Sequence, residues 1–259
     1  MTRKFKKLFY FLYCSLFYEK DKFKNQQEEI FKRNNLDRFI AKKNLDTIIK
    51  KNNLSVSEMV SEHEVIFSSL SLDKNIKVDR ILEIGTYDGS NAVLLSELFP
   101  NSQIITVDLP SKDDEFNKTY KRNNLDFQNE FIKSRNEKLS RLKNVEFIEM
   151  NSINLINEKK TFDLIWIDGA HGYPIVTIDI INSLRLCNLN GLILCDDVYV
   201  KKIKNQDPYY FSNATFETIK ILKSQKLINY DLFLKRIDNK FNYFPIEKKY
   251  IAFIKKFNI

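Results

Sequence analysis

The chain has 259 residues, and its 43% hydrophobic content is enough for a packed core, which excludes a globally disordered protein. The formal net charge of +8 comes from the two ends, because residues 1–24 and 235–259 each carry +5 and residues 25–234 carry −2. A nearly neutral middle does not by itself attract polyanions, so no nucleic-acid partner is expected.

The cysteines are Cys14, Cys187 and Cys195, an odd number without a C-x-x-C pair. This pattern predicts neither a disulfide framework nor a zinc site. It favours a reducing compartment, so we expect a cytoplasmic protein.

The first pattern along the chain is an apolar, aromatic stretch at residues 8–18, with lysines on both sides. It is too short to cross a bilayer, which takes roughly 20 residues, and no small-residue cleavage site follows it. We expect a helix that packs on the domain or on a partner subunit, so an oligomer is compatible with the sequence. The alternative is a peripheral contact with the inner face of a membrane.

Residues 24–52 carry isoleucine and phenylalanine at helical spacing. Ser55 and Glu58 have the spacing of a capping box in front of a further apolar helix face. His63 falls on that helix and is expected to be structural. The sequence therefore predicts an N-terminal helical extension over residues 1–75.

From residue 76 the pattern changes to short apolar runs rich in β-branched residues, which predict buried parallel strands. The runs are 80–84, 103–108, 145–149, 162–168 and 191–196. Helical stretches separate them at 91–99, 115–142 and 175–187. A helix at 215–223 and an antiparallel pair at 229–234 and 250–257 are expected to complete the sheet.

The alternation of these elements predicts an α/β fold. We expect a Rossmann-like, doubly wound, mostly parallel seven-stranded sheet with helices on both faces. The domain would span residues 76–259, with 110–144 as a helical insertion or lid.

Two glycines follow the first strand, Gly85 and Gly89, at a sheet edge where ligands approach the backbone closely. The second strand ends at Asp108, which is well placed to accept hydrogen bonds from both hydroxyls of a ribose. The loop leads into a helix that Ser90 or Asn91 can cap. Together these features indicate a site for a nucleoside-containing cofactor.

Glu83, Gly85 and Gly89 resemble the first motif of class I S-adenosylmethionine (SAM)-dependent methyltransferases, an acidic and a hydrophobic residue before Gly-x-x-x-Gly. The resemblance implies a SAM site. The cofactor-binding residues expected from it are Glu83, Gly85, Thr86, Gly89, Ser90, Asp108, Leu109, Asn151, Ser152 and Asp168. The alternative is an NAD-dependent oxidoreductase, but Tyr87 occupies the middle position of its G-x-G-x-x-G fingerprint.

A second group of polar residues follows the next two strands: Asp168 and His171 come after the fourth, and Asp196 and Asp197 end the fifth. Neighbouring parallel strands lie about 4.8 Å apart, so these side chains could converge. Three close carboxylates repel one another unless one is protonated or a cation bridges them.

This group is similar to metal-dependent O-methyltransferases of the catechol and caffeoyl-coenzyme A type, and closer still to bacterial small-molecule and sugar O-methyltransferases. The resemblance implies Mg²⁺ at Asp168, Asp196 and Asp197. His171 is the candidate general base, with Asp168 beside it as a second catalytic residue, because histidine titrates near the working pH. Three alternatives stay open: Asp168 caps its loop, His171 holds substrate or loop, and the site works without a metal.

The function expected from this combination is O-methylation of a hydroxyl on a small molecule or a glycan unit. A different class is a non-catalytic cofactor-binding protein that docks through its basic termini, against which the clustered polar residues argue. An RNA methyltransferase has only the net charge in its favour.

Overall fold

The computed structural model describes residues 20–52, 54, 61–119, 124–202, 212–237 and 248–257. The apolar stretch at 8–18 and the capping box at 55–58 lie outside the described residues. Within the described ranges, no helix combines the length and the apolar character that crossing a bilayer requires.

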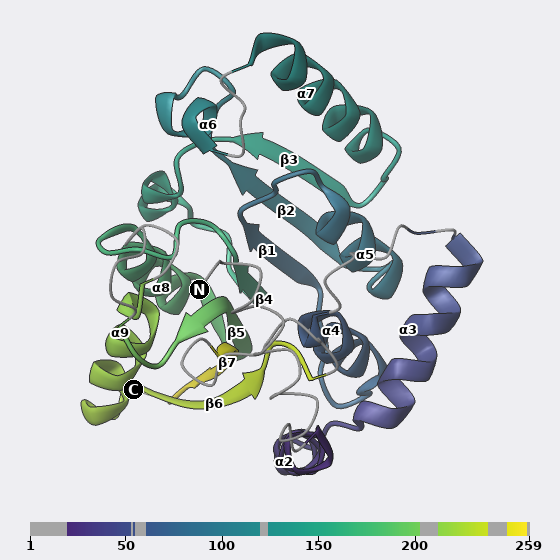
Figure 1. Ribbon diagram of the computed structural model, residues 1–259, viewed down its shortest axis with the longest axis vertical. Helices are drawn as coiled ribbons and strands as arrows, with labels where there is room; N and C mark the ends of the chain where they lie inside the picture. Colours follow the sequence, from purple (N-terminus) through teal and green to yellow (C-terminus); the bar gives the residue numbers. More distant parts are fainter. Residues whose placement is uncertain are drawn as a thin grey trace, which may run out of the picture.

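Seven strands of the described chain form one sheet in the order β3-β2-β1-β4-β5-β7-β6 (Figure 1). They are β1 Arg80–Ile84, β2 Gln103–Asp108, β3 Val145–Glu149, β4 Phe162–Ile167, β5 Cys187–Tyr199, β6 Ile228–Leu234 and β7 Lys249–Lys256. The pairs among β1 to β5 are parallel, and β7 is antiparallel to both of its neighbours. This confirms the predicted fold class.

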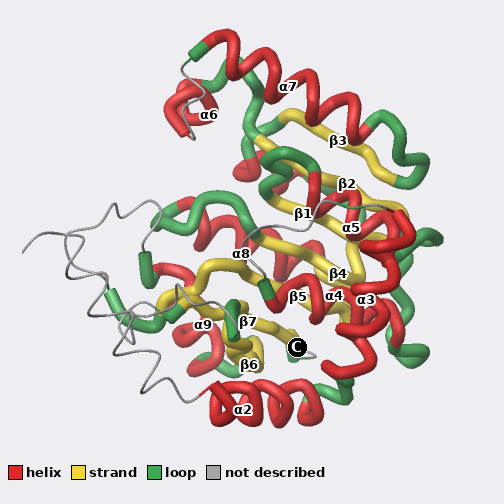
Figure 2. The backbone as a smooth tube through the Cα atoms, turned by 45° about the vertical axis from the view of Figure 1, so that its right-hand side comes forward, coloured by secondary structure: helices red, strands yellow, loops and turns green. Residues whose placement is uncertain are grey.

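Helices cover both faces of the sheet (Figure 2). The described helices are α2 Lys20–Arg33, α3 Arg38–Asn52, α4 Glu62–Leu72, α5 Ser90–Leu98, α6 Asp114–Lys118, α7 Leu125–Leu139, the 3₁₀ helix η2 Ser152–Asn157, α8 Ile175–Leu186 and α9 Ala214–Ser224. The helical stretch expected at 115–142 contains two helices, α6 and α7, which Asp113 and Asn124 cap through their side chains.

Side chains of the strands alternate between two hydrophobic clusters, one on each face. Ile81 and Trp166 belong to the cluster under α2, α3, α4 and α5, whereas Leu82 and Ile165 belong to the cluster under α8 and α9. All four are fully buried, and burial of each side chain of this size is worth about 1.5–3 kcal/mol.

The described part of the N-terminal extension packs into the first of these clusters. Phe31 of α2 meets Phe233 of β6 edge to face, with ring centroids 5.0 Å apart. A buried bidentate ion pair, with two N–O distances of 2.7 Å, joins Arg38 of α3 to Glu62 of α4. The domain boundary near residue 75 stays a prediction.

The strand directions decide which residues meet at the functional edge. β1, β2, β4 and β5 end at one edge, the carboxyl edge of the parallel sheet. β6 and β5 are both antiparallel to β7, so β6 ends and β7 begins at that same edge. Lys235 directly follows β6 and Lys249 begins β7, which places both lysines near the end of β5.

Candidate active site

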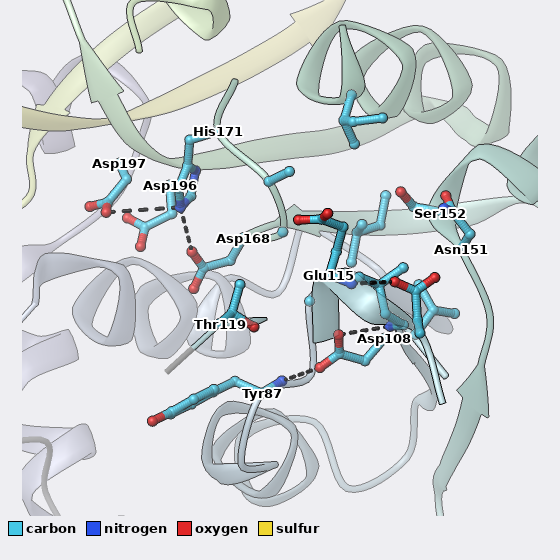
Figure 3. Close-up of a pocket in the computed structure, with 18 of the residues that line it drawn as sticks. Tyr87, Asp108, Glu115, Thr119, Asn151, Ser152, Asp168, His171, Asp196 and Asp197 are labelled. Carbon is cyan, nitrogen blue, oxygen red and sulfur yellow. Dashed lines mark hydrogen bonds and ion pairs between the residues drawn. The ribbon is translucent and has the colours of Figure 1, made fainter. Parts of the chain in front are cut away.

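A cavity of about 830 Å³ opens along the carboxyl edge (Figure 3), a size typical of sites for small molecules and cofactors. Its walls come from the ends of β1, β2, β3, β4 and β5 and from the segment around α6. The polar residues that line it include Asp108, Asp113, Glu115, Lys118, Thr119, Asn151, Ser152, Asp168, His171, Asp196, Asp197, Lys235, Arg236 and Lys249.

Gly85 brings the loops after β1 and β4 together. Its φ is +102°, and a Cβ at this position would lie 2.3 Å from the carbonyl oxygen of Asp168, so no other residue fits. Gly89 lies behind the cavity wall instead. It has a φ of +78°, precedes α5, and a Cβ there would press on the side chain of Leu139 at 3.0 Å.

Glu83 is also behind the wall rather than in it. Its carboxylate is fully buried and accepts hydrogen bonds from Asn91 Nδ2, at 2.7 Å, and from Thr106 Oγ1. Thr86 Oγ1 lies 2.6 Å from Thr106 Oγ1 and continues this network. Burial raises the pKa of Glu83 to about 7, which the two hydrogen bonds partly oppose.

Four residues expected to bind the cofactor therefore do not line the cavity: Glu83, Thr86, Gly89 and Ser90. The first three shape the loop from behind, and Ser90 donates to the carboxylate of Asp88. The sequence pattern marks this loop correctly but does not distinguish residues that face a ligand from residues that support the turn. A contact of these four with a cofactor stays a prediction.

The other predicted cofactor residues line the cavity, and Asp108 is the best defined of them. Its carboxylate accepts hydrogen bonds from the backbone N–H groups of Tyr87 and Leu109, both at 2.8 Å. A carboxylate oxygen accepts more than one hydrogen bond, so Asp108 suits a vicinal diol such as a ribose. Asn151 and Ser152 lie further along the same wall, at the start of η2.

The insertion between β2 and β3 covers one side of the cavity. Arg135 of α7 is fully buried, and its guanidinium lies over the ring of Phe147, 4.4 Å from the centroid. Phe131 of α7 meets Tyr87 of the glycine loop at 5.4 Å and Phe116 of α6 at 6.3 Å. Aromatic and cation–π contacts thus hold α6 and α7 against the cavity.

The acidic pair sits in an irregular part of β5. The register between β5 and β7 shifts between Cys195 and Val198, and Asp197 has a φ of +51°. A bulge of this kind re-aims side chains, and strained backbone of this type clusters at functional sites. Both aspartates line the cavity, and Asp196 is the more deeply buried of the two.

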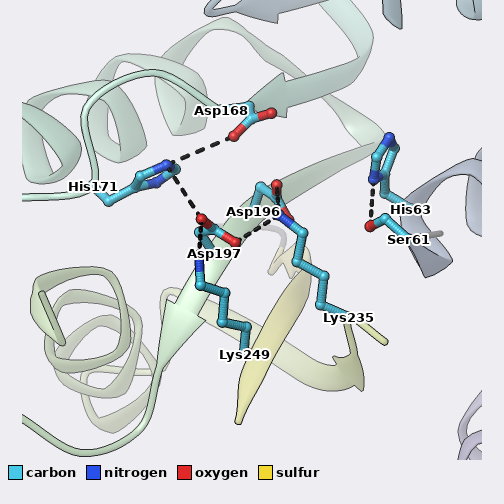
Figure 4. Close-up of polar contacts among 8 residues, drawn as sticks. All are labelled: Ser61, His63, Asp168, His171, Asp196, Asp197, Lys235 and Lys249. Carbon is cyan, nitrogen blue, oxygen red and sulfur yellow. Dashed lines mark hydrogen bonds and ion pairs between the residues drawn. The ribbon is translucent and has the colours of Figure 1, made fainter. Parts of the chain in front are cut away.

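Two lysines hold this pair (Figure 4). Lys235 Nζ donates to Asp196 Oδ2 and, at 2.6 Å, to Asp197 Oδ1, while Lys249 Nζ donates to Asp197 Oδ2. Burial would raise the pKa of Asp197, but Lys235, His171 and Lys249 hold it well below its usual range. The same pairing raises the pKa of Lys235 despite its burial.

Sequence reasoning missed both lysines. Lys235 follows the end of β6 and Lys249 begins β7, about forty to fifty residues after the aspartates in the sequence. The antiparallel pairing of β7 with β5 and β6 places both lysines beside the aspartates. The sequence did contain one indication of them. Three neighbouring carboxylates need a cation, and a lysine can supply it.

A divalent metal does not fit the described site well. Asp168, Asp196 and Asp197 line the same cavity, as predicted. However, the described residues contain no group of three His, Cys, Asp or Glu side chains arranged to hold a metal ion. The ammonium of Lys235 bridges Asp196 and Asp197, where a bridging cation would stand.

His171 faces this cluster from the loop after β4. Its Nε2 lies 3.7 Å from Asp168 Oδ1 and 3.9 Å from Asp197 Oδ2. Burial lowers the pKa of His171, although Asp197 and Asp196 oppose the shift, so the neutral imidazole prevails at neutral pH. Enclosure by the cavity walls and then Asp196 raise the pKa of Asp168 above its usual range.

The strand order and a cofactor-sized cavity at the carboxyl edge define the class: an α/β protein built like the class I methyltransferases. Residues 82–198 match the family model described as a methyltransferase domain. This match covers less than half of the chain, and it agrees with the resemblance drawn from the sequence motifs.

Solved structures with the same fold include several methyltransferases. The O-methyltransferase TomG from Streptomyces achromogenes, in complex with SAM, superposes with a TM-score of 0.55 at 13% identity, over 84% of this chain and 90% of that one. SAH-bound PaMTH1 from Podospora anserina gives 0.52 at 18%, over 84% and 88%. Cofactor-bound Rv0187 from MTB gives 0.54 at 16%, over 83% and 88%. No curated protein sequence gives a significant match.

Proposed function

We propose that this protein is a SAM-dependent O-methyltransferase that acts on a hydroxyl group of a small molecule or a glycan unit. One observation carries the proposal. The same cavity is lined by Asp108, whose carboxylate suits a ribose diol, and by His171, a neutral imidazole beside two carboxylates. One cavity thus contains a group suited to bind the cofactor and a group suited to remove a proton.

The hydrogen-bonding groups that line the cavity fit the ribose and the adenine of SAM. Asp108 would hold the ribose, the wall at Asn151 and Ser152 would flank the adenine, and Gly85 lets the loop after β4 approach closely beside the cavity. When bound, SAM supplies a methyl group whose bond to the sulfonium sulfur breaks, the electron pair staying on sulfur, as a bond to the substrate oxygen forms. Two fold neighbours were solved with such a ligand, TomG in complex with SAM and PaMTH1 with SAH bound.

The chain's own contribution to the chemistry is proton removal and orientation. His171 Nε2 would accept the proton of the substrate hydroxyl, since burial keeps the imidazole neutral. Asp168 and Asp197, within 4 Å of that nitrogen, would stabilise the imidazolium that results. The α6–α7 segment would exclude water and align the reacting atoms, which supplies much of the acceleration in such a transfer.

Calorimetric titration with SAM and with NAD tests the cofactor class directly. We expect SAM to bind and NAD not to bind. Replacing Asp108 by Ala should weaken SAM binding by roughly 10- to 100-fold, about 1.5–3 kcal/mol, because hydrogen bonds to a charged group are lost. The exposed Asp46 of α3 gives a matched control, Asp46→Ala, with unchanged affinity. NAD binding without SAM binding would overturn the proposal.

A further inference from the structure

We infer that the ammonium of Lys235 is the resident cation of this active site, in the place of a divalent metal, and that it donates a hydrogen bond to the substrate oxygen during methyl transfer. The inference deepens the proposed function and rests on it for the substrate oxygen. Its consequence is a methyl transfer that needs no metal.

The contacts of Lys235 are those of a bridging ion. Its Nζ reaches one oxygen of Asp196 and, at 2.6 Å, one oxygen of Asp197. An ammonium has three N–H donors, and these two bonds use two of them. Lys235 also lines the cavity together with Asp168 and His171, so its third donor is available for an oxygen bound there.

The position of Lys235 is fixed by the fold. Its backbone N–H donates to Lys249 O at 3.0 Å, and its carbonyl accepts from the backbone N–H of Glu62 at 2.8 Å. The residue keeps only 7% of its surface exposed. A buried ammonium persists only when it is paired, and two carboxylates provide that pairing. The ammonium of Lys235 is therefore held in place by the fold, unlike the mobile ammonium of an exposed lysine.

The charges of the acidic pair already balance. Asp196 and Asp197 face two ammonium groups, those of Lys235 and Lys249. A divalent ion between Asp196 and Asp197 would have to displace Lys235 and leave its charge buried beside the metal. The ammonium of Lys235 and a divalent ion beside it would repel each other strongly in a partly buried site. The arrangement therefore disfavours metal binding.

The reaction step uses Lys235 without consuming it. The hydroxyl proton moves to His171 Nε2, the oxygen forms its bond to the methyl carbon, and the carbon–sulfur bond breaks with its electron pair on sulfur. A Lys235 N–H stabilises the negative charge that develops on the oxygen, and the ammonium keeps its proton. A donor aimed at developing charge in this way accounts for roughly 100- to 1,000-fold in rate in other enzymes.

Titration of the full chain with Mn²⁺, followed by electron paramagnetic resonance, tests the cation without any substrate. We expect no Mn²⁺ binding to the wild-type protein up to about 1 mM, the weak end of carboxylate sites for divalent ions. Lys235→Ala frees Asp196 and Oδ1 of Asp197, while Lys249 still holds Oδ2, and should create a Mn²⁺ site. Lys220→Ala, at an exposed position of α9, should not. Binding of Mn²⁺ by the wild-type protein at the acidic pair would overturn the inference.

Activity provides the second arm. Wild-type turnover should be unchanged by EDTA, and Lys235→Met, which keeps the length of the side chain without its charge, should lose roughly 100-fold in kcat while still binding SAM. Loss of wild-type turnover in EDTA, or full turnover of Lys235→Met, would overturn the role of Lys235. Failure of the wild-type protein to bind SAM would instead refute the proposed function, and the Mn²⁺ result would stand independently.

Discussion

His171 illustrates how much of this site is decided by the surroundings of single residues. Asp168, Asp197, Lys235 and Lys249 surround its ring, and burial tips the balance toward the neutral form. The motif after β4 was enough to nominate Asp168 and His171 from the sequence. Their protonation was not predictable, because it depends on lysines that the motif does not contain.

At the residue scale we predict a pH–rate profile that reports His171. Its pKa is lowered from 6.5, so kcat should rise as pH increases through a value below 6.5 and then stay level across neutral pH. His171→Gln should lower kcat by roughly 100- to 10,000-fold and remove that acidic limb. Stopped assays across the pH range, with SAM saturating, measure both effects. An acidic limb that survives in the variant would assign the base to another residue.

Elements were predictable from the sequence where one local pattern decided them. β1, β2 and β3 have the predicted bounds, because apolar runs and flanking turn residues agree there. β5 is longer than expected at both ends, running from Cys187 to Tyr199. Cys187 already pairs with Phe162 of β4, and pairing with β7 continues past the bulge at Asp196–Asp197 to Tyr199. Bulges arise from the partner strand and leave little trace in the sequence of one strand.

Glu83 joins three elements, and its burial gives a prediction at the element scale. It stands on β1 and binds Asn91 of α5 and Thr106 of β2. Its pKa rises from 4.5 in the unfolded chain to about 7, so between these values the folded protein binds more protons. Stability should therefore fall as pH rises from 4.5 to 7 and level off above, by about 3 kcal/mol for this group.

Glu83→Gln should remove that loss, because glutamine keeps hydrogen bonds without a charge. Urea unfolding at several pH values measures the difference between variant and wild type, which should grow from pH 4.5 to 7. Only the difference between variant and wild type is informative, because two other buried groups titrate in or near the same pH range. Burial raises the pKa of Glu64 to about 7 and lowers the pKa of His63 to about 4. Glu130→Gln, at an exposed position of α7, is the control. Parallel curves for Glu83→Gln and wild type would refute the prediction.

At the scale of the whole molecule, the N-terminal helices support the active site through β6. Gln27 of α2 exchanges hydrogen bonds with the backbone of Leu234, at 3.1 and 2.8 Å, directly before Lys235. Phe31 of the same helix is fully buried against Phe233. The sequence indicated helices here but not what they cover, because amphipathic faces do not specify their partner.

We therefore predict that α2 unfolds together with the sheet. Phe31→Ala should lower the free energy of unfolding by about 3–5 kcal/mol, since it empties a volume in the cluster that also contains Trp166. Urea unfolding followed by circular dichroism and by the fluorescence of Trp166, the single tryptophan of the chain, should show one coincident transition that shifts as a whole. Phe39→Ala, at a 64% exposed position of α3, should change the free energy of unfolding by less than about 0.5 kcal/mol. If residues 1–75 were an independent unit, Phe31→Ala would leave the tryptophan transition in place, and the extension could not be what fixes Lys235.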